Sequence, residues 1–131
     1  MKRALYLFSI LILLLLFQPK GGTIFYLLNI RWLYVFLISF FLVIVFVPPA
    51  IKIAEKFKIL DYPDKRKIHL FPIPRSGGLA IFLAFVISII RNLQISQEIL
   101  GLLIGSVLIF ILGFLDDIKP LSATLRLIAQ I

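Results

Sequence analysis

The 131-residue sequence contains no cysteine and only one histidine. Without cysteine, the chain has no thiolate metal site. Acidic residues are also scarce: six Asp and Glu stand against fourteen Lys and Arg, which leaves a net charge of +8. In a soluble protein this balance would suggest nucleic acid, but no basic helix or aromatic stacking platform accompanies it. We therefore expect no nucleic-acid partner.

Hydrophobic residues are in excess, at 62% of the chain, and the mean hydropathy is +1.13. A soluble domain is usually nearer half apolar. The excess is gathered into long runs without polar–apolar alternation, which disfavours a transmembrane β-barrel. A helix satisfies its own backbone polar groups inside lipid. The sequence therefore predicts an all-α, polytopic transmembrane protein with about four spans.

Four apolar runs are the candidate spans, over residues 4–17, 33–47, 77–90 and 99–115. The first resembles a signal peptide, but no small-residue cleavage site follows it, so we expect a short, uncleaved span, with cleavage as the alternative. Pro48-Pro49 closes the second run, and we expect helix to resume beyond a kink. In the fourth run Gly101, Gly105 and Gly113 lie nearly on one helical face, which predicts a seam for close helix packing.

The distribution of Lys and Arg predicts the orientation. If the N-terminus is inside and all four runs cross, eleven Lys and Arg fall in cytoplasmic segments and three fall outside. This asymmetry agrees with the positive-inside rule. It places the basic loop, residues 52–75, on the same cytoplasmic side as Asp116-Asp117. A turn follows the aspartates, and Ser122 is placed to cap a helix that begins at Ala123.

Asp116 and Asp117 close the fourth run and are candidates for function, because carboxylates at a membrane boundary are costly to desolvate. They repel each other and the carbonyl end of their helix. Lys119, Arg126 or a residue of the basic loop could compensate them. A divalent cation is the alternative, since Mg²⁺ is commonly held by one or two carboxylates together with substrate phosphates. Neighbouring helical residues point about 100° apart, so we expect the two aspartates to have different roles.

The basic loop holds seven Lys and Arg, and positive-inside bias or attraction to anionic lipid explains several of them. The run Lys65-Arg66-Lys67, followed by His69, suits the binding of phosphate oxygens. A lone histidine in a basic loop is nevertheless more often incidental. After Arg75, Gly77-Gly78 opens the third run, where two glycines allow a backbone or ligand to approach closely.

Three motifs carry a family resemblance: DYPDKRKIH at 61–69, PIPRSGGLAI at 72–81 and GFLDDIK at 113–119. They resemble the polyprenyl-phosphate N-acetylhexosamine-1-phosphate transferases, the family that includes the lipid I translocase. The match begins near Leu33. We therefore divide the chain into an extra N-terminal span with its outer loop, residues 1–31, and the first part of the transferase membrane domain, residues 32–131. The loop lacks the KxGTPTMGG pattern of lipid I translocases and is more similar to the UDP-N-acetylglucosamine type.

The resemblance implies transfer of an N-acetylhexosamine 1-phosphate from a UDP-sugar to undecaprenyl phosphate, with UMP leaving. The reaction is Mg²⁺-dependent, takes place on the cytoplasmic face of the inner (plasma) membrane, and begins cell-envelope polysaccharide synthesis. The resemblance assigns Asp116 and Asp117 to catalysis and to the metal. It assigns contacts with substrate phosphates to Lys67, His69, Arg75, Gly77 and Gly78. A homodimer remains open.

Members of that family are more than twice as long, so we expect this chain to be a fragment that is inactive alone. The alternative is a small non-enzymatic membrane protein whose polybasic loop binds anionic lipid or a partner. Such a loop has no use for Asp116-Asp117, so these residues distinguish the two readings. Other prenyl- or phosphatidyl-transferring enzymes space their aspartates about one helical turn apart, and that spacing is absent here.

Overall fold

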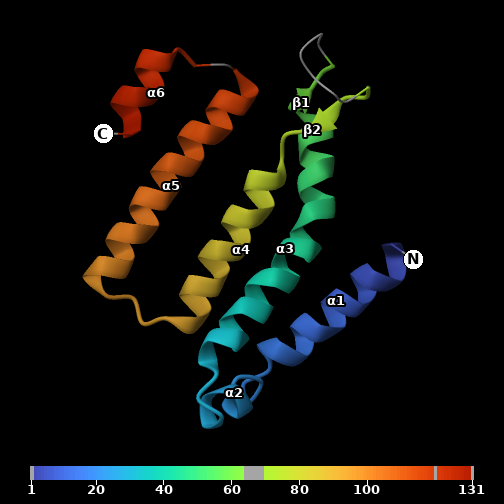
Figure 1. Ribbon diagram of the computed structural model, residues 1–131, viewed down its shortest axis with the longest axis vertical. Helices are drawn as coiled ribbons and strands as arrows, with labels where there is room; N and C mark the ends of the chain where they lie inside the picture. Colours follow the sequence, from blue (N-terminus) through green and yellow to red (C-terminus); the bar gives the residue numbers. More distant parts are fainter. Residues whose placement is uncertain (1, 64–69, 120, 131) are drawn as a thin grey trace.

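A computed structural model describes residues 2–63, 70–119 and 121–130. Within these ranges the chain is almost entirely helical, which confirms the all-α prediction, and one short antiparallel strand pair interrupts the helices (Figure 1). The elements in chain order are α1 (Lys2–Phe17), α2 (Thr23–Leu27), α3 (Arg31–Lys56), β1 (Leu60–Asp61), β2 (Ile73–Pro74), α4 (Gly77–Asn92), α5 (Gln97–Ile118) and α6 (Ala123–Gln130).

The four longer helices stand in chain order, with α3 between α1 and α4, and α5 beyond α4 (Figure 1). Apolar side chains of α1 and α3 form the core with one residue of α4: Leu13, Leu16, Tyr34, Ile38, Leu42 and Ala84. The Ser39 hydroxyl donates to the backbone oxygen of Val35 and lies 2.8 Å from the Ser88 hydroxyl. This contact joins α3 to α4 inside an otherwise apolar interface.

Small residues make the close approach of α3 and α4 possible. Ala80, Ala84 and Ser88 recur every four residues along α4 and are at most 4% exposed. Ala50 and Ala54 are buried at the same spacing on α3. The predicted glycine seam on α5 is wrong for the helices described here. A Cβ added at any of its three glycines would meet nothing within 4 Å, and no residue of α5 is buried.

Two helices, α3 and α5, are long and apolar enough to cross a membrane, at 26 and 22 residues. Their lengths of about 39 and 33 Å exceed a hydrocarbon core of about 30 Å. The apolar helices α1 and α4 have 16 residues each and reach only about 24 Å. Crossing by all four remains a prediction. The extensive apolar surface of α5 is that of a membrane protein.

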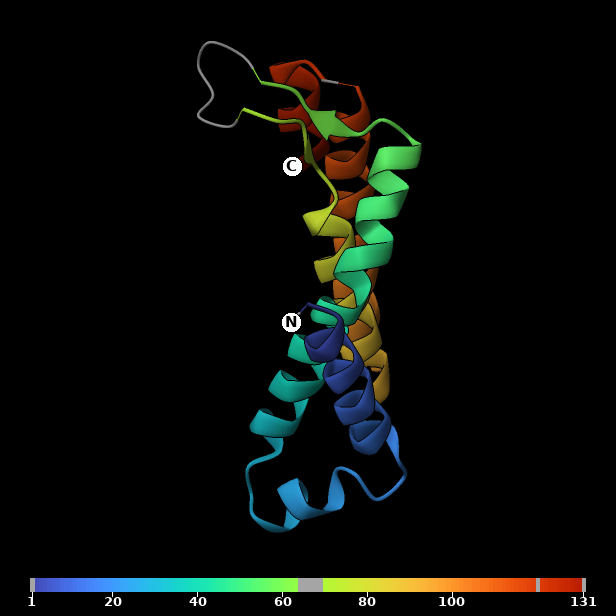
Figure 2. The ribbon, with the colours of Figure 1, turned by 90° about the vertical axis from the view of Figure 1, so that its right-hand side faces the viewer.

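The prolines that were expected to close the second span lie inside one continuous helix. The helix α3 includes Pro48 and Pro49 and ends only at Lys56. Proline lacks a backbone N–H, so the carbonyls of Ile44 and Val45 lose their helical partners. The axis of α3 bends between its two halves in both views (Figures 1 and 2), which agrees with the predicted kink. The short α2 is a separate element, and the chain turns at Asn29, whose φ is 58°.

The strand pair positions one end of the basic loop. Leu60 pairs with Pro74 and Asp61 with Ile73, and the backbone N–H of Arg75 donates to the Ile59 oxygen at 3.1 Å. Ile59 is only 3% exposed, so this junction is anchored in the protein. The strand pair lies at the same end of the molecule as α6 and the end of α5 (Figure 2).

Candidate functional site

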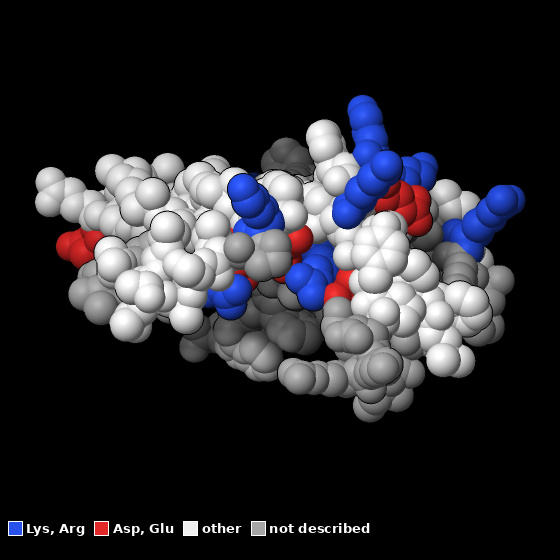
Figure 3. Space-filling model, turned by 90° about the horizontal axis from the view of Figure 1, so that it is seen from above, with Lys and Arg blue, Asp and Glu red and all other residues white. Residues whose placement is uncertain are grey.

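The hairpin and the end of α5 meet through Arg75. Its guanidinium lies 2.6 Å from Oδ1 of Asp61 and 4.0 Å from Oδ1 of Asp117. The backbone bond to Ile59 holds Arg75 just before α4, and α5 carries Asp117 to the same end of the molecule. Viewed toward this end, basic and acidic side chains lie among one another (Figure 3). The prediction that the two motif regions lie at one end is confirmed for the described residues.

Asp116 faces a different partner, on α6. Its Oδ1 accepts from the backbone N–H of Leu121 at 2.7 Å and pairs with Nη2 of Arg126 at 3.0 Å. Arg126 also donates to the Leu121 oxygen, which ties α6 back onto the end of α5. Ser122 accepts from the N–H of Leu125 at 3.3 Å, as predicted for a helix cap. The Asp116 carboxylate therefore fixes the turn that leads into α6.

The two carboxylates differ in what holds them, as the helical spacing predicts. Among the described residues, Asp116 is 27% exposed and has two close donors, whereas Asp117 is 41% exposed and has one loose ion pair. A loosely held, half-exposed carboxylate is free to exchange its partner at little cost, because an exposed ion pair contributes about 0–1 kcal/mol. Asp117 is thus the more available of the two for a new cationic or metal partner.

The space beside the aspartates is small. A pocket of about 140 Å³ lies against Asp116 and is completed by Gly113, Leu121 and Arg126, with two apolar residues of α5. Small-molecule sites usually enclose about 300–1,000 Å³. A larger, mostly apolar groove of about 820 Å³ is lined by α1 and α3 and does not include the aspartates. The described residues therefore do not enclose a nucleotide beside Asp116.

Gly77 and Gly78 form the first turn of α4, directly after Arg75 and Ser76. A Cβ at either glycine would meet nothing within 4 Å, and neither glycine has a positive φ. The side chain of Ser76, 5% exposed, makes no capping hydrogen bond. The first N–H groups of a helix lack intrahelical partners, and the space where a Cβ of either glycine would lie is open. The prediction that a ligand could approach closely here is consistent with this geometry.

Two of the predicted phosphate contacts, Lys67 and His69, lie outside the described residues. Among the residues that are described, no group of three His, Cys, Asp or Glu could hold a metal ion. Asp117 offers one carboxylate, and Mg²⁺ needs only one or two when phosphates and waters complete its shell. The residues present therefore fit a Mg²⁺ ion shared with a phosphate substrate. They do not fit one enclosed by protein ligands alone.

The structure adds Asp61 to the residues singled out from the sequence. It lies in the first motif but was not marked as functional, because its partner Arg75 is fourteen residues away. Only the strand pairing brings the two together. Arg126, considered only as a neutralising partner, proves to be the residue that holds Asp116.

The helical architecture, its long apolar helices and the arginine–aspartate contacts define an α-helical membrane protein with a charged site at one end. No family model and no solved structure matches the chain. Curated relatives do. A probable undecaprenyl-phosphate N-acetylglucosaminyl 1-phosphate transferase of Bacillus subtilis is 33% identical over 103 residues, which is 78% of this chain and 29% of the relative.

Two further relatives bear the name undecaprenyl-phosphate alpha-N-acetylglucosaminyl 1-phosphate transferase. The protein of Yersinia pestis is 34% identical over 75% of this chain and 26% of its own length. That of Thermotoga maritima is 36% identical over 56% of this chain and 23% of its own. By sequence, the chain is similar to polyprenyl-phosphate N-acetylglucosamine-1-phosphate transferases, as the motifs predict. All three relatives are named as N-acetylglucosaminyl transferases, which is the type of enzyme that the sequence of the basic loop favours. The chain spans about a quarter of the length of these relatives.

Proposed function

We propose that this chain forms the acceptor-phosphate part of the active site in a transferase that moves N-acetylglucosamine 1-phosphate from a UDP-sugar to undecaprenyl phosphate. The relatives' names support the reaction class. The observation that carries the proposal is the position of Arg75 between Asp61 and Asp117. It joins two motifs that the sequence separates by a whole apolar helix.

The chemistry explains why such a site needs both signs of charge. An oxygen of the acceptor phosphate attacks the β-phosphorus of the UDP-sugar, the bond from that phosphorus to the bridging oxygen breaks, and UMP leaves. Both reactants are anionic, so positioning and charge neutralisation supply most of the catalysis. Bound Mg²⁺ would supply further neutralisation, with Asp117 as its ligand from this chain.

Each described residue then has a defined task. Arg75 and the N–H groups of Gly77 and Gly78 bind oxygens of the acceptor phosphate, while Asp61 orients the Arg75 guanidinium. Asp116 is a positioning residue in this geometry, because Arg126 and the Leu121 N–H already engage it. Lys67 and His69 remain predicted phosphate contacts. The donor nucleotide would bind outside the described residues, since the pocket at Asp116 is too small for it.

The test is transferase activity in membranes that contain the protein at its natural length, with radiolabelled UDP-N-acetylglucosamine and undecaprenyl phosphate. Asp117→Asn is the informative variant, because the Asp117 ion pair is loose and its loss should spare the fold. Glu98→Gln is the matched control, since it removes one carboxylate from the first turn of the same helix, at the end away from the site. We expect Asp117→Asn to lower the rate at least about a hundredfold and Glu98→Gln to leave it unchanged.

Wild-type activity in Asp117→Asn would contradict the assignment of this carboxylate. The competing reading, a non-enzymatic protein with a lipid-binding basic loop, predicts a different pattern. Reversing the charges of Lys52 and Lys56 would then weaken binding to anionic vesicles, and neither aspartate would matter for any measured property. Membrane insertion of every variant is checked by extraction and protease protection, so that a failure to fold is recognised.

A further inference from the structure

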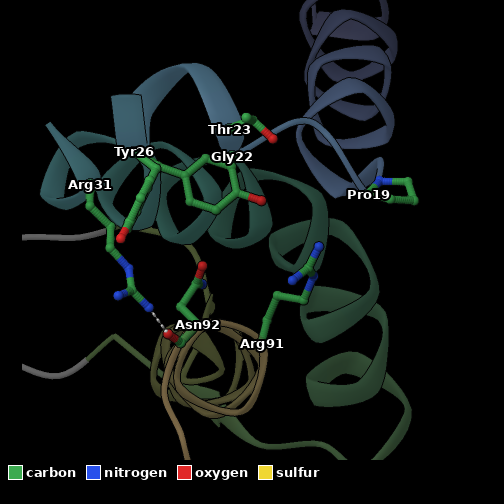
Figure 4. A pocket seen from close by; sticks show the side chains of 8 residues that line it. Pro19, Gly22, Thr23, Tyr26, Arg31, Arg91 and Asn92 are labelled. Carbon is green, nitrogen blue, oxygen red and sulfur yellow. Dashed lines mark hydrogen bonds between the residues drawn. The ribbon is translucent and has the colours of Figure 1, made fainter. Parts of the chain in front are cut away.

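A second charged cleft lies at the end of the molecule opposite the aspartates. It is an open cleft of about 430 Å³ between the link from α1 to α2, the beginning of α3 and the end of α4. Two arginines line it: Arg31 from the first turn of α3 and Arg91 from the last turn of α4. They lie on either side of Asn92 (Figure 4). Nothing in the proposed transfer reaction uses this end.

The two arginines have few partners within the protein. In the part of the chain that the structure describes, neither forms an ion pair with an acidic side chain. Arg31 donates from Nη2 to the Asn92 backbone oxygen at 2.5 Å, and the Arg91 guanidinium lies 6.0 Å from the centre of the Phe17 ring. A guanidinium carries five N–H donors. Most of these donors therefore remain available inside a cleft where two like charges repel each other.

The cleft is built by specific contacts. The Tyr34 hydroxyl donates to the Leu16 oxygen at 2.8 Å, and this pins the end of α1 beside the beginning of α3. Gly22 lies so close to the Tyr34 ring that a Cβ there would be 3.1 Å from it. The chain thus passes closely over the ring and forms one wall of the cleft. Tyr26 and Thr23 add hydroxyl groups to the lining.

This set of donors matches a phosphate group. Paired guanidinium forks bind phosphate oxygens in a planar, bidentate manner, and hydroxyl and amide groups complete the shell. The volume lies within the usual range for small-molecule sites. Tyr26 in the cleft lining and Trp32, next to Arg31 in the chain, are 70% and 69% exposed, as aromatic residues are at the head-group level of a membrane. We propose that Arg31 and Arg91 form a phosphate-binding site at this end, which takes either a phospholipid head group or a soluble phosphate.

The site also accounts for an exception in the charge pattern. Positive-inside bias explains the cations near the basic loop. Arg31 and Arg91 belong to the first turn of α3 and the last turn of α4, which lie at the other end of the molecule (Figure 1). A bound anion gives both arginines an acidic partner, which the described residues do not supply. The inference is independent of the proposed transferase activity, because it shares no residue with that site.

The experiment uses the protein at its natural length, purified in neutral-detergent micelles, with two probes. Inorganic phosphate binding is measured by calorimetry. Retention of phosphatidylglycerol is measured by native mass spectrometry against diacylglycerol, which has the same apolar chains but no phosphate. Arg91→Gln is the main variant, because Arg91 donates no side-chain hydrogen bond within the described residues, and Arg91→Lys tests the charge alone. Lys20→Gln is the matched control, since it removes one cation near the cleft but outside its lining.

We expect Arg91→Gln and Arg31→Gln to weaken binding of at least one probe about tenfold or more. Arg91→Lys should retain part of the affinity, and Lys20→Gln should retain all of it. Binding of inorganic phosphate indicates a soluble ligand, and selective retention of phosphatidylglycerol indicates a head group. The proposal is overturned if neither probe binds, or if Lys20→Gln weakens binding as much as the arginine variants do. Thermal unfolding of each variant identifies any loss of fold.

Discussion

Replacing Arg75 with Gln removes a side chain that contacts both Asp61 and Asp117. The hairpin register and the bond from the Arg75 N–H to Ile59 involve only the backbone, so they should persist in the variant. Arg75→Gln therefore separates the ion pairs from the architecture that places them. It also tests whether the two acidic partners are held unequally, as the role of Asp117 requires.

The expected magnitudes follow from distance and exposure. A hydrogen bond to a charged group contributes about 1.5–3 kcal/mol when shielded, and an exposed ion pair about 0–1 kcal/mol. The Arg75 side chain is 40% exposed and that of Asp61 is 22% exposed, with 2.6 Å between their atoms. After discounting for solvent, we expect this pair to stabilise the protein by about 1 kcal/mol. The pair with Asp117, at 4.0 Å and 41% exposure, should contribute less than about 0.5 kcal/mol.

Two double-mutant cycles measure these pairs, one combining Arg75→Gln with Asp61→Asn and the other combining it with Asp117→Asn. Reversible unfolding in mixed micelles supplies the free energies, and each cycle isolates its pairwise coupling. A coupling to Asp117 equal to or larger than that to Asp61 would refute the reasoning, because Asp117 would then be committed to Arg75. Absence of coupling in both cycles would show that solvent screens the whole cluster.

The remaining predictions concern helix packing. Ala84→Leu should lower the free energy of unfolding by about 1–3 kcal/mol, because Ala84 is 1% exposed in the core. Gly105→Ala should raise it by up to about 1 kcal/mol, since a Cβ there meets only open space; a destabilised Gly105→Ala would show that a partner packs on this face of α5. Ser39→Ala should lower the free energy of unfolding by about 0.6 kcal/mol, because it removes the interhelical hydrogen bond to Ser88. A Ser39→Ala/Ser88→Ala double variant that is as stable as the single variant would confirm the pairing.

Most of the helices could be predicted from hydropathy alone. The runs at 77–90 and 99–115 lie within α4 and α5, and the Ser122 cap marks the beginning of α6. These features depend on residues close together in the chain, so local pattern is sufficient to predict them. Pro48 and Pro49 end the second apolar run, but the helix continues past them to Lys56 with a bend, as the expected kink requires.

The packing seam shows what local pattern leaves undecided. Glycines on α5 and small residues on α4 are equally good candidates for close approach, and only the fold shows that Ala80, Ala84 and Ser88 are the buried set. Which face of a helix is covered depends on its neighbours, and neighbours are set by tertiary contacts.

For the charged sites, too, the local sequence decided some features and the tertiary structure decided the others. The sequence by itself determined the apolar helices, the family motifs and the presence of Asp116 and Asp117 at a helix end. Only the tertiary structure decided that Arg75 bridges Asp61 and Asp117, and that Arg31 and Arg91 share one cleft. Hydropathy and capping act between residues a few positions apart. Ion pairs and clefts act through space, between residues that the chain separates and the fold brings together.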